Sequence, residues 1–281
     1  MPYITVDRTG NAPVSLYYED HGRGRPVVLV HGSPLDARCW EKQAAALLAA
    51  GYRVIAYDRR GFGRSDKPAH GYEHGSFAAD LDVIMETLDL RDAILAGFSA
   101  GTGDVGRYLT VYGAGRVAKA AFLAPIQPGP LRSPHNPNGL RRPVFNLILD
   151  AARADRYAFS DDFFAAFYNT DRFLGTPRLS EAALRASRNF AARASAHATA
   201  ACVHTWAADL RPDVERIAAL GLPTLILHGA ADRILPAHAT ARPFRDAVPH
   251  AAYVEIEDAP HGLLWTHADE VNEALLAFAK G

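Results

Sequence analysis

The sequence has few cysteines and no long apolar run. Its 281 residues include two cysteines, Cys39 and Cys202, which form no C-x-x-C pair. This usage argues against a disulfide framework and against a cysteine zinc site, so we expect two packed thiols. No segment reaches the roughly 18 apolar residues of a membrane span, and residues 1–10 contain no apolar signal-peptide core. We therefore expect a cytoplasmic protein that does not associate with a membrane.

The sequence also lacks an excess of charge of either sign. Thirty Lys and Arg against 31 Asp and Glu leave a formal net charge of −1. Nothing electrostatic then points to nucleic acid or to an anionic lipid surface, and the expected partner is a small molecule. The hydrophobic content of 49% is enough for a substantial core. Self-association into a homo-oligomer is left open.

Apolar and amphipathic segments alternate along most of the chain. Continuously apolar segments are typical of strands covered on both faces, as in a parallel sheet. Tyr3–Val6 and Val14–Asp20 alternate instead, which predicts an antiparallel edge pair joined by a turn over 10–13. Ser76 is the predicted N-cap of a helix with one apolar face. The pattern predicts an α/β fold with a mostly parallel, doubly wound sheet of about eight strands, including strands over 26–30, 52–57, 93–96, 117–123, 223–227 and 251–256.

The alternation stops after residue 126. Six prolines occur between 125 and 143, and helix-favouring segments rich in alanine and aromatic residues then continue to Trp206, including one over 180–201. We predict two parts of an α/β core, 1–126 and 207–281, separated by a helical cap over 127–206. Any single aromatic residue here is more often core than pocket. As a group, we expect the following residues to line a substrate pocket: Phe98, Phe145, Phe164, Trp206 and Leu235.

Gly97-Phe98-Ser99-Ala100-Gly101 is a G-x-S-x-G sequence between an apolar strand and a helical segment. A sharp turn from strand to helix exposes a serine hydroxyl and leaves free backbone N–H groups beside it. The motif is short and also fits an ordinary turn, so its partners must decide. Asp232 and His261 each follow a later predicted strand, in the order expected of an α/β-hydrolase triad. Because parallel strands end at one edge of a sheet, Ser99, Asp232 and His261 can meet.

A second loop, His31-Gly32-Ser33-Pro34, follows the first buried strand. Acyl transfer needs two donors for the developing oxyanion, and the backbone N–H groups of Ser33 and Ala100 are the candidates. We expect His31 and His228 to hold their loops through ring hydrogen bonds. The glycine-rich loop over 58–65 lacks the G-x-x-x-x-G-K-[ST] pattern of a phosphate site and is interpreted as structural.

Together these segments resemble the α/β-hydrolase fold, and within it the cofactor-free haloperoxidase and arylesterase group. The resemblance spans nearly the whole chain and implies a serine esterase that can also make peracids from hydrogen peroxide, with Ser99, Asp232 and His261 as its triad. Members commonly carry an aromatic residue in place of Ser33 and methionine or threonine in place of Ala100. The loss of the aromatic predicts room for larger acyl groups, unless cap aromatics refill the space. The resemblance rests on these segments: HGSPLDARCW at 31–40, AYDRRGFGRSDKP at 56–68, GFSAG at 97–101, GRVAKAAFLAP at 115–125, PTLILHGAADRILP at 223–236 and APHGL at 259–263.

The sequence therefore predicts a serine hydrolase that forms an acyl-enzyme from carboxylic esters, with neither metal nor organic cofactor. The same groups can open a lactone, a lactam or a C–C bond, and sequence does not separate these reactions. A ligand-binding protein that retains the triad but turns over slowly is the alternative from another class. Haloalkane dehalogenases and epoxide hydrolases place aspartate where Ser99 stands, which disfavours both.

Overall fold

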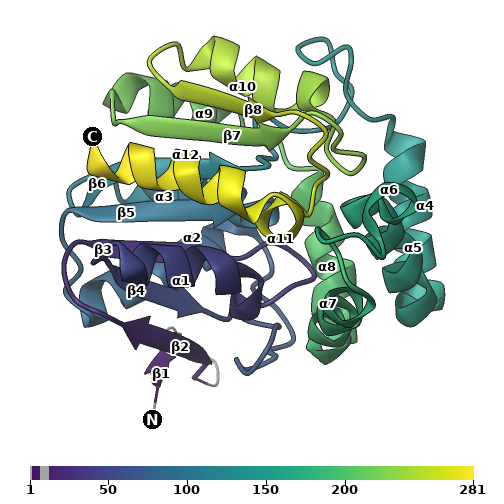
Figure 1. Ribbon diagram of the computed structural model, residues 1–281, viewed down its shortest axis with the longest axis horizontal. Helices are drawn as coiled ribbons and strands as arrows, with labels where there is room; N and C mark the ends of the chain where they lie inside the picture. Colours follow the sequence, from purple (N-terminus) through teal and green to yellow (C-terminus); the bar gives the residue numbers. More distant parts are fainter. Residues whose placement is uncertain (1, 7–12) are drawn as a thin grey trace.

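Eight strands of the described chain form one mixed sheet (Figure 1). The computed structural model describes residues 2–6 and 13–281, so residues 10–12 of the predicted edge turn lie outside the described part. The strand order is β1-β2-β4-β3-β5-β6-β7-β8, with β2 antiparallel to both neighbours and all later pairs parallel. This confirms the predicted fold class. The strands are β1 (Tyr3–Thr5), β2 (Ser15–His21), β3 (Pro26–Val30), β4 (Arg53–Tyr57), β5 (Ala93–Phe98), β6 (Val117–Leu123), β7 (Thr224–Gly229) and β8 (Ala252–Ile256).

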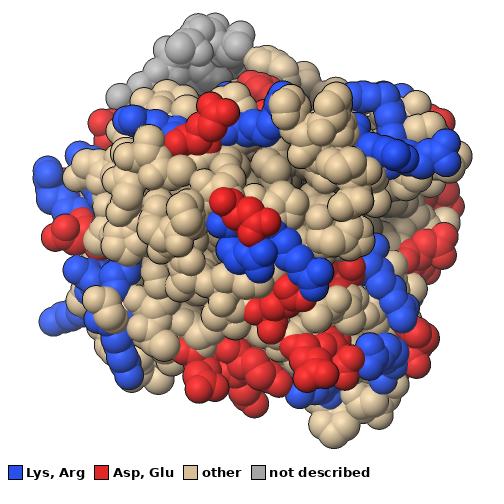
Figure 2. All heavy atoms as spheres, turned by 90° about the horizontal axis from the view of Figure 1, so that it is seen from above, with Lys and Arg blue, Asp and Glu red and all other residues tan. Residues whose placement is uncertain are grey.

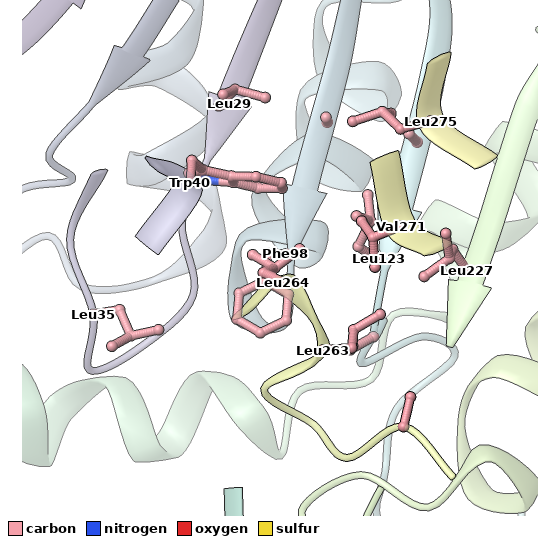
Figure 3. Close-up of a cluster of buried hydrophobic side chains, with 14 of the residues drawn as sticks. Leu29, Leu35, Trp40, Phe98, Leu123, Leu227, Leu263, Leu264, Val271 and Leu275 are labelled. Carbon is pink, nitrogen blue, oxygen red and sulfur yellow. The ribbon is translucent and has the colours of Figure 1, made fainter. Parts of the chain in front are cut away.

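Helices cover both faces of the sheet because its central strands are apolar on both sides. In β3, Leu29 packs toward α1 and α12, whereas Val28 and Val30 pack toward α2 and α3. Figure 3 shows the first of these clusters, in which Val271 and Leu275 belong to α12. The core helices are α1 (Glu41–Ala49), α2 (His74–Thr87), α3 (Ala100–Val111), α9 (Arg211–Leu220), α10 (Ala241–Ala247), α11 (Leu263–Thr266) and α12 (Ala268–Lys280), with 3₁₀ turns at Ala37–Trp40 and Ala237–Ala239.

A helical insert follows β6 and gathers at one end of the sheet (Figure 1). None of the described residues from 127 to 206 belongs to a named strand. The helix-favouring segment over 180–201 forms two helices, because Ser180 and Ser195 each cap a separate helix by accepting from the N–H three residues on. The boundaries of the cap stay a prediction. The insert helices are α4 (Arg142–Ala154), α5 (Arg156–Tyr168), α6 (Thr170–Phe173), α7 (Glu181–Arg193) and α8 (Ala196–Trp206).

The start of α2 also differs from the prediction. Glu73, not Ser76, occupies the N-cap position, and Ser76 lies in the first turn with its hydroxyl bonded to the Glu73 carboxylate. The helix begins at His74, whose ring contacts Asp104 of α3 at 2.7 Å. Among the described helices, none is long and apolar enough to cross a membrane. Basic and acidic groups are interspersed on the face seen in Figure 2, as the net charge of −1 suggests.

Candidate active site

Ser99 lies at the junction between β5 and α3. Its backbone has φ 52° and ψ −124°, a conformation that side chains rarely adopt and that holds the hydroxyl away from both elements. The flanking glycines are required sterically. A Cβ at Gly97 would lie 2.8 Å from the Gly101 carbonyl oxygen, and one at Gly101 would lie 2.4 Å from the Val30 carbonyl oxygen. Glycine at these two positions therefore lets the strand, turn and helix pack this closely without a shift.

Ser99, His261 and Asp232 form one hydrogen-bonded chain of buried side chains. Ser99 Oγ lies 2.9 Å from His261 Nε2, and His261 Nδ1 lies 2.6 Å from Asp232 Oδ2. The three residues follow β5, β8 and β7, whose carboxyl ends meet at the same edge of the sheet. The structure thus brings together the three residues that sequence reasoning selected.

Asp232 is fixed by more than His261. Its Oδ1 accepts the backbone N–H groups of Ile234 and Leu235, both at 2.8 Å. His228 Nε2 lies 3.2 Å from Oδ2 and 2.7 Å from the Leu235 carbonyl oxygen, so its ring braces the loop as the sequence predicts. Burial alone would raise the pKa of Asp232, but the charge and hydrogen bonds of His261 and His228 outweigh it and hold the pKa well below its ordinary value. The carboxylate is therefore ionised at neutral pH.

Three other aspartates could be considered as the carboxylate partner of His261. Each of them forms an exposed ion pair with a surface arginine and none with His261. These pairs are Asp209 with Arg211, Asp246 with Arg245 and Asp258 with Arg172.

The loop after β3 closes over Ser99. A Cβ at Gly32 would lie 2.7 Å from the Ser99 Cβ, so glycine is needed for this approach. The Ser33 N–H has no acceptor among the described residues, and the Ala100 N–H is one of the unpaired donors at the start of α3. These two N–H groups are available to a negatively charged oxygen.

His31 holds this loop from behind. Its Nδ1 donates to the Gly32 carbonyl oxygen and its Nε2 accepts the Arg59 backbone N–H, each at 2.9 Å, the tautomer being the one that satisfies both bonds. Burial, with a smaller contribution from the Arg59 charge, lowers the pKa of His31 to about 4. The ring is therefore neutral at physiological pH and serves the loop structurally, as predicted.

A small chamber opens beside Ser99, with about 240 Å³ of space that includes its mouth. Trp206 and Leu235 border it, as predicted. Three predicted pocket residues do not: Phe98 packs against the His261 ring at 5.3 Å, Phe164 against Phe167, and Phe145 is buried on α4. Their placement corrects the prediction, because Phe98 and Phe164 belong to the buried core and none of the three lines the chamber. The chamber is lined by Ser33, Ser99, Ile126, Phe163, Trp206, Ile234 and Leu235.

Sequence reasoning missed three of the lining residues. Ile126 and Ile234 follow the ends of β6 and β7 closely, so the same edge-of-sheet rule that selected Asp232 could have found them. Phe163 belongs to an i, i+4 stripe on α5 with Phe159 and Phe167, whose direction only packing reveals.

The alpha/beta hydrolase fold family model matches residues 25–268, which include the whole Ser99, Asp232 and His261 arrangement. The chain belongs to the α/β-hydrolase family. This α/β hydrolase is 49% identical to a Synechocystis sp. protein assigned to the non-heme chloroperoxidases, with 99% of each chain covered. It is 37% identical to a non-heme chloroperoxidase of Streptomyces lividans, over 95% of this chain and 96% of that protein.

A solved structure of similar architecture is a bromoperoxidase from Bacillus anthracis, with a TM-score of 0.93, 40% identity and 99% of each chain covered. These similarities make the α/β hydrolase a relative of the non-heme haloperoxidases and of the esterases and perhydrolases. It is accordingly a hydrolase- or perhydrolase-type enzyme.

The remaining reactive groups of the α/β hydrolase lie apart from the triad. Cys39 is partly exposed and Cys202 is buried, and neither is in a disulfide. Burial raises the pKa of Cys202 to about 11, which keeps that thiol protonated. Within residues 2–6 and 13–281, no three His, Cys, Asp or Glu side chains form a group that could hold a metal ion.

Proposed function

We propose that this α/β hydrolase is a serine esterase that cleaves carboxylic esters through a covalent acyl-enzyme. The observation that carries the proposal is the pair of contacts Ser99 Oγ to His261 Nε2 at 2.9 Å and His261 Nδ1 to Asp232 Oδ2 at 2.6 Å. A nucleophile within reach of a base that is itself oriented by a carboxylate is the arrangement that acyl transfer requires.

The reaction begins with His261 Nε2 as general base. It takes the Ser99 proton as Oγ attacks the ester carbonyl, and the Asp232 carboxylate stabilises the imidazolium that forms. The negative oxygen of the tetrahedral intermediate accepts hydrogen bonds from the Ser33 and Ala100 N–H groups. His261 then protonates the leaving alcohol, which departs and leaves Ser99 acylated.

Water completes the cycle by attacking the acyl group with His261 again as base. Hydrogen peroxide in place of water would release a peracid, and this perhydrolase reaction is a second candidate. It is favoured by the 30% identity, across 100% of both chains, with a protein named bifunctional esterase/perhydrolase from Acinetobacter calcoaceticus. It is also favoured by the haloperoxidase relatives.

The segment 127–206 acts as the cap of this proposed site. Phe163 and Trp206 of the insert border the chamber, while Ile126 and Leu235 border it from the core. The chamber is narrow and mostly apolar in its lining residues, which favours a small ester-like molecule.

The test is turnover of p-nitrophenyl acetate by the purified protein. Continuous release of nitrophenol over many turnovers supports the esterase, whereas a single stoichiometric burst supports the slow-turnover binding protein. A panel of esters, lactones, lactams and diketones, with and without peroxide, then ranks the bonds by kcat/KM. A lactone, lactam or diketone that exceeds every ester by a hundredfold would replace the ester assignment.

A further inference from the structure

We propose that the Ser33 hydroxyl is a third donor to the oxyanion, and that the buried Arg59 is a positioning residue that occupies a lone pair of this hydroxyl and leaves its proton available to the Ser99 chamber. The proposal rests on the proposed acyl-transfer function and adds a side-chain group to its two backbone donors.

Arg59 is a fixed positive charge beneath the loop that carries Ser33. Its side chain is completely buried, and Nε lies 2.7 Å from Asp104 Oδ2. The guanidinium carbon lies 3.9 Å from the Phe77 ring centre, a cation–π contact on its flat face. Asp104 is held in turn by His74 Nδ1 at 2.7 Å. The guanidinium is thus held by an ion pair at Nε and by the Phe77 ring on one face, and its position is set by the core.

The free edge of the guanidinium faces Ser33. Nη1 of Arg59 lies 3.4 Å from Ser33 Oγ, and arginine has donors but no acceptor. The Ser33 oxygen must therefore present a lone pair to Arg59. The Cys202 thiol is a second neighbour of the Ser33 side chain, and a hydrogen bond from the Ser33 hydroxyl acts to lower the pKa of that thiol against the effect of burial, so the hydroxyl donates to the sulfur.

A serine hydroxyl has two lone pairs and one proton. With Arg59 on a lone pair, the proton of Ser33 can be donated either to the Cys202 sulfur or to an acceptor in the chamber. Ser33 is 5% exposed and lines the same chamber as Ser99, so an oxyanion formed on the Ser99 adduct lies within that chamber. An ionised oxygen is a far better acceptor than a thiol sulfur, and the O–H bond strengthens as the charge develops.

The Arg59 charge contributes a second, longer-range effect. The charge is not screened by water, because the side chain is buried, and the carboxylate that pairs with it in the described part of the chain, that of Asp104, also contacts His74. Polarised by this cation, the Ser33 hydroxyl becomes a stronger donor than an isolated serine. The donor acts in the transition state and not on the neutral ester, so its removal should lower kcat more than it changes KM.

The experiment compares parent, Ser33→Ala, Ser33→Thr and Ser33→Val on p-nitrophenyl acetate. Thr and Val have nearly the same shape, so their difference isolates the hydroxyl, and every variant keeps the backbone N–H. We expect Ala and Val to lower kcat by roughly tenfold to a hundredfold, less than the 10²–10³ of a sole donor, with KM within twofold. Thr should stay within about threefold of the parent. Ser76→Ala, on the outer side of α2, is the matched serine control and should leave kcat unchanged.

A second readout separates this role from a structural one. A trifluoromethyl ketone forms a charged hemiketal on Ser99, whereas the corresponding secondary alcohol binds as a neutral ligand. Ser33→Ala should weaken the ketone by the same factor as kcat/KM and leave the alcohol within twofold. In an Arg59→Lys background the Ser33→Ala effect should shrink to threefold or less, since the guanidinium no longer occupies a lone pair of the Ser33 hydroxyl. If that background does not fold, the Thr and Val pair decides.

Two failures are distinguishable. If Ser99→Ala abolishes turnover but Ser33→Ala and Ser33→Val match the parent in kcat and in ketone affinity, the Ser33 role is overturned and the esterase stands. If the parent turns over no ester, or Ser99→Ala retains turnover, both the esterase function and the Ser33 role fall.

Discussion

Ser99, Asp232 and His261 lie on loops that follow the carboxyl ends of parallel strands, whereas Phe163 and Trp206 lie on helices of the insert. Hydrogen-bonded backbone holds the first group in place, and its side chains contact one another at 2.6 and 2.9 Å. The second group is located by aromatic packing, such as the 6.0 Å between the Phe163 and Trp206 ring centres. The sheet thus sets the geometry of the chemistry and the insert sets the shape of the substrate space. Changes at the sheet edge should therefore alter rate, and changes in the insert should alter preference.

The largest expected effect removes the nucleophile. Ser99→Ala should abolish labelling by an organophosphonate and lower kcat/KM for p-nitrophenyl acetate by between roughly 10⁴- and 10⁶-fold, because no acyl-enzyme can form. Mass spectrometry of the intact protein measures the labelling, and circular dichroism checks the fold. If Ser99→Ala kept kcat/KM within tenfold of the parent, the sheet edge would not carry the chemistry, and the distinction between a catalytic sheet edge and a shape-setting insert would fail.

Asp232→Asn tests the carboxylate at the same edge of the sheet while it preserves the shape of the side chain. The amide cannot stabilise the imidazolium and favours the wrong tautomer of His261, so kcat should fall roughly 10³- to 10⁴-fold while the unfolding midpoint stays near that of the parent. Asp258→Asn is the matched control, because its carboxylate contacts Arg172 on the surface at 2.9 Å. A control that lost as much activity as Asp232→Asn would move the assignment of the carboxylate.

The sequence predicted the triad residues at the sheet edge better than it predicted which residues of the insert line the chamber. The triad was found because continuously apolar strands have a recognisable pattern and parallel strands end at one edge, so that residues as distant as Ser99 and His261 could be placed together. The glycines of the G-x-S-x-G motif are required because a Cβ at either position would lie too close to backbone atoms, and this requirement can be recognised from the motif alone.

No comparable rule orients an aromatic side chain on an insert helix. Phe163 and Phe164 are neighbours in sequence, yet the first borders the chamber and the second packs against Phe167 and Tyr168. If α5 were rotated about its axis by one residue, Phe163 and Phe164 would exchange their environments. The contacts of α5 with the other insert helices set this rotation. Likewise, the break between α7 and α8 depends on which serines act as caps, which local composition alone did not decide.

His31 provides a stability test of the loop that holds the oxyanion site. Its pKa is lowered to about 4 from 6.5, so protonation favours the unfolded chain as pH falls through that window. The free energy of unfolding should drop by roughly 2–3 kcal/mol between pH 7 and pH 4.5 through this group, and the stability should be fully present above pH 6.5.

Urea unfolding of the parent and of His31→Gln at both pH values measures this loss. The variant should lose less stability on acidification, since its side chain does not titrate. His21→Gln is the matched control, because the His21 side chain is 60% exposed, and it should follow the parent. Parallel losses in the parent and His31→Gln would show that the ring is not held neutral by the fold.

The smallest expected effect concerns the insert and should change preference without changing the chemistry. Trp206→Ala removes one wall of the chamber that Ser33, Phe163 and Ile126 also line, and opens space for a longer acyl group. Each buried methylene contributes about 0.8 kcal/mol, so two more between acetyl and butyryl correspond to about tenfold in kcat/KM. The ratio of butyryl to acetyl turnover should rise by that factor, with the phosphonate labelling of Ser99 retained. Phe145→Ala, an aromatic loss on the buried side of α4, should leave the ratio unchanged. If the ratio of butyryl to acetyl turnover rose equally in Trp206→Ala and Phe145→Ala, the change would not come from the wall of the chamber. The residues of the insert that line the chamber would then not determine the acyl preference.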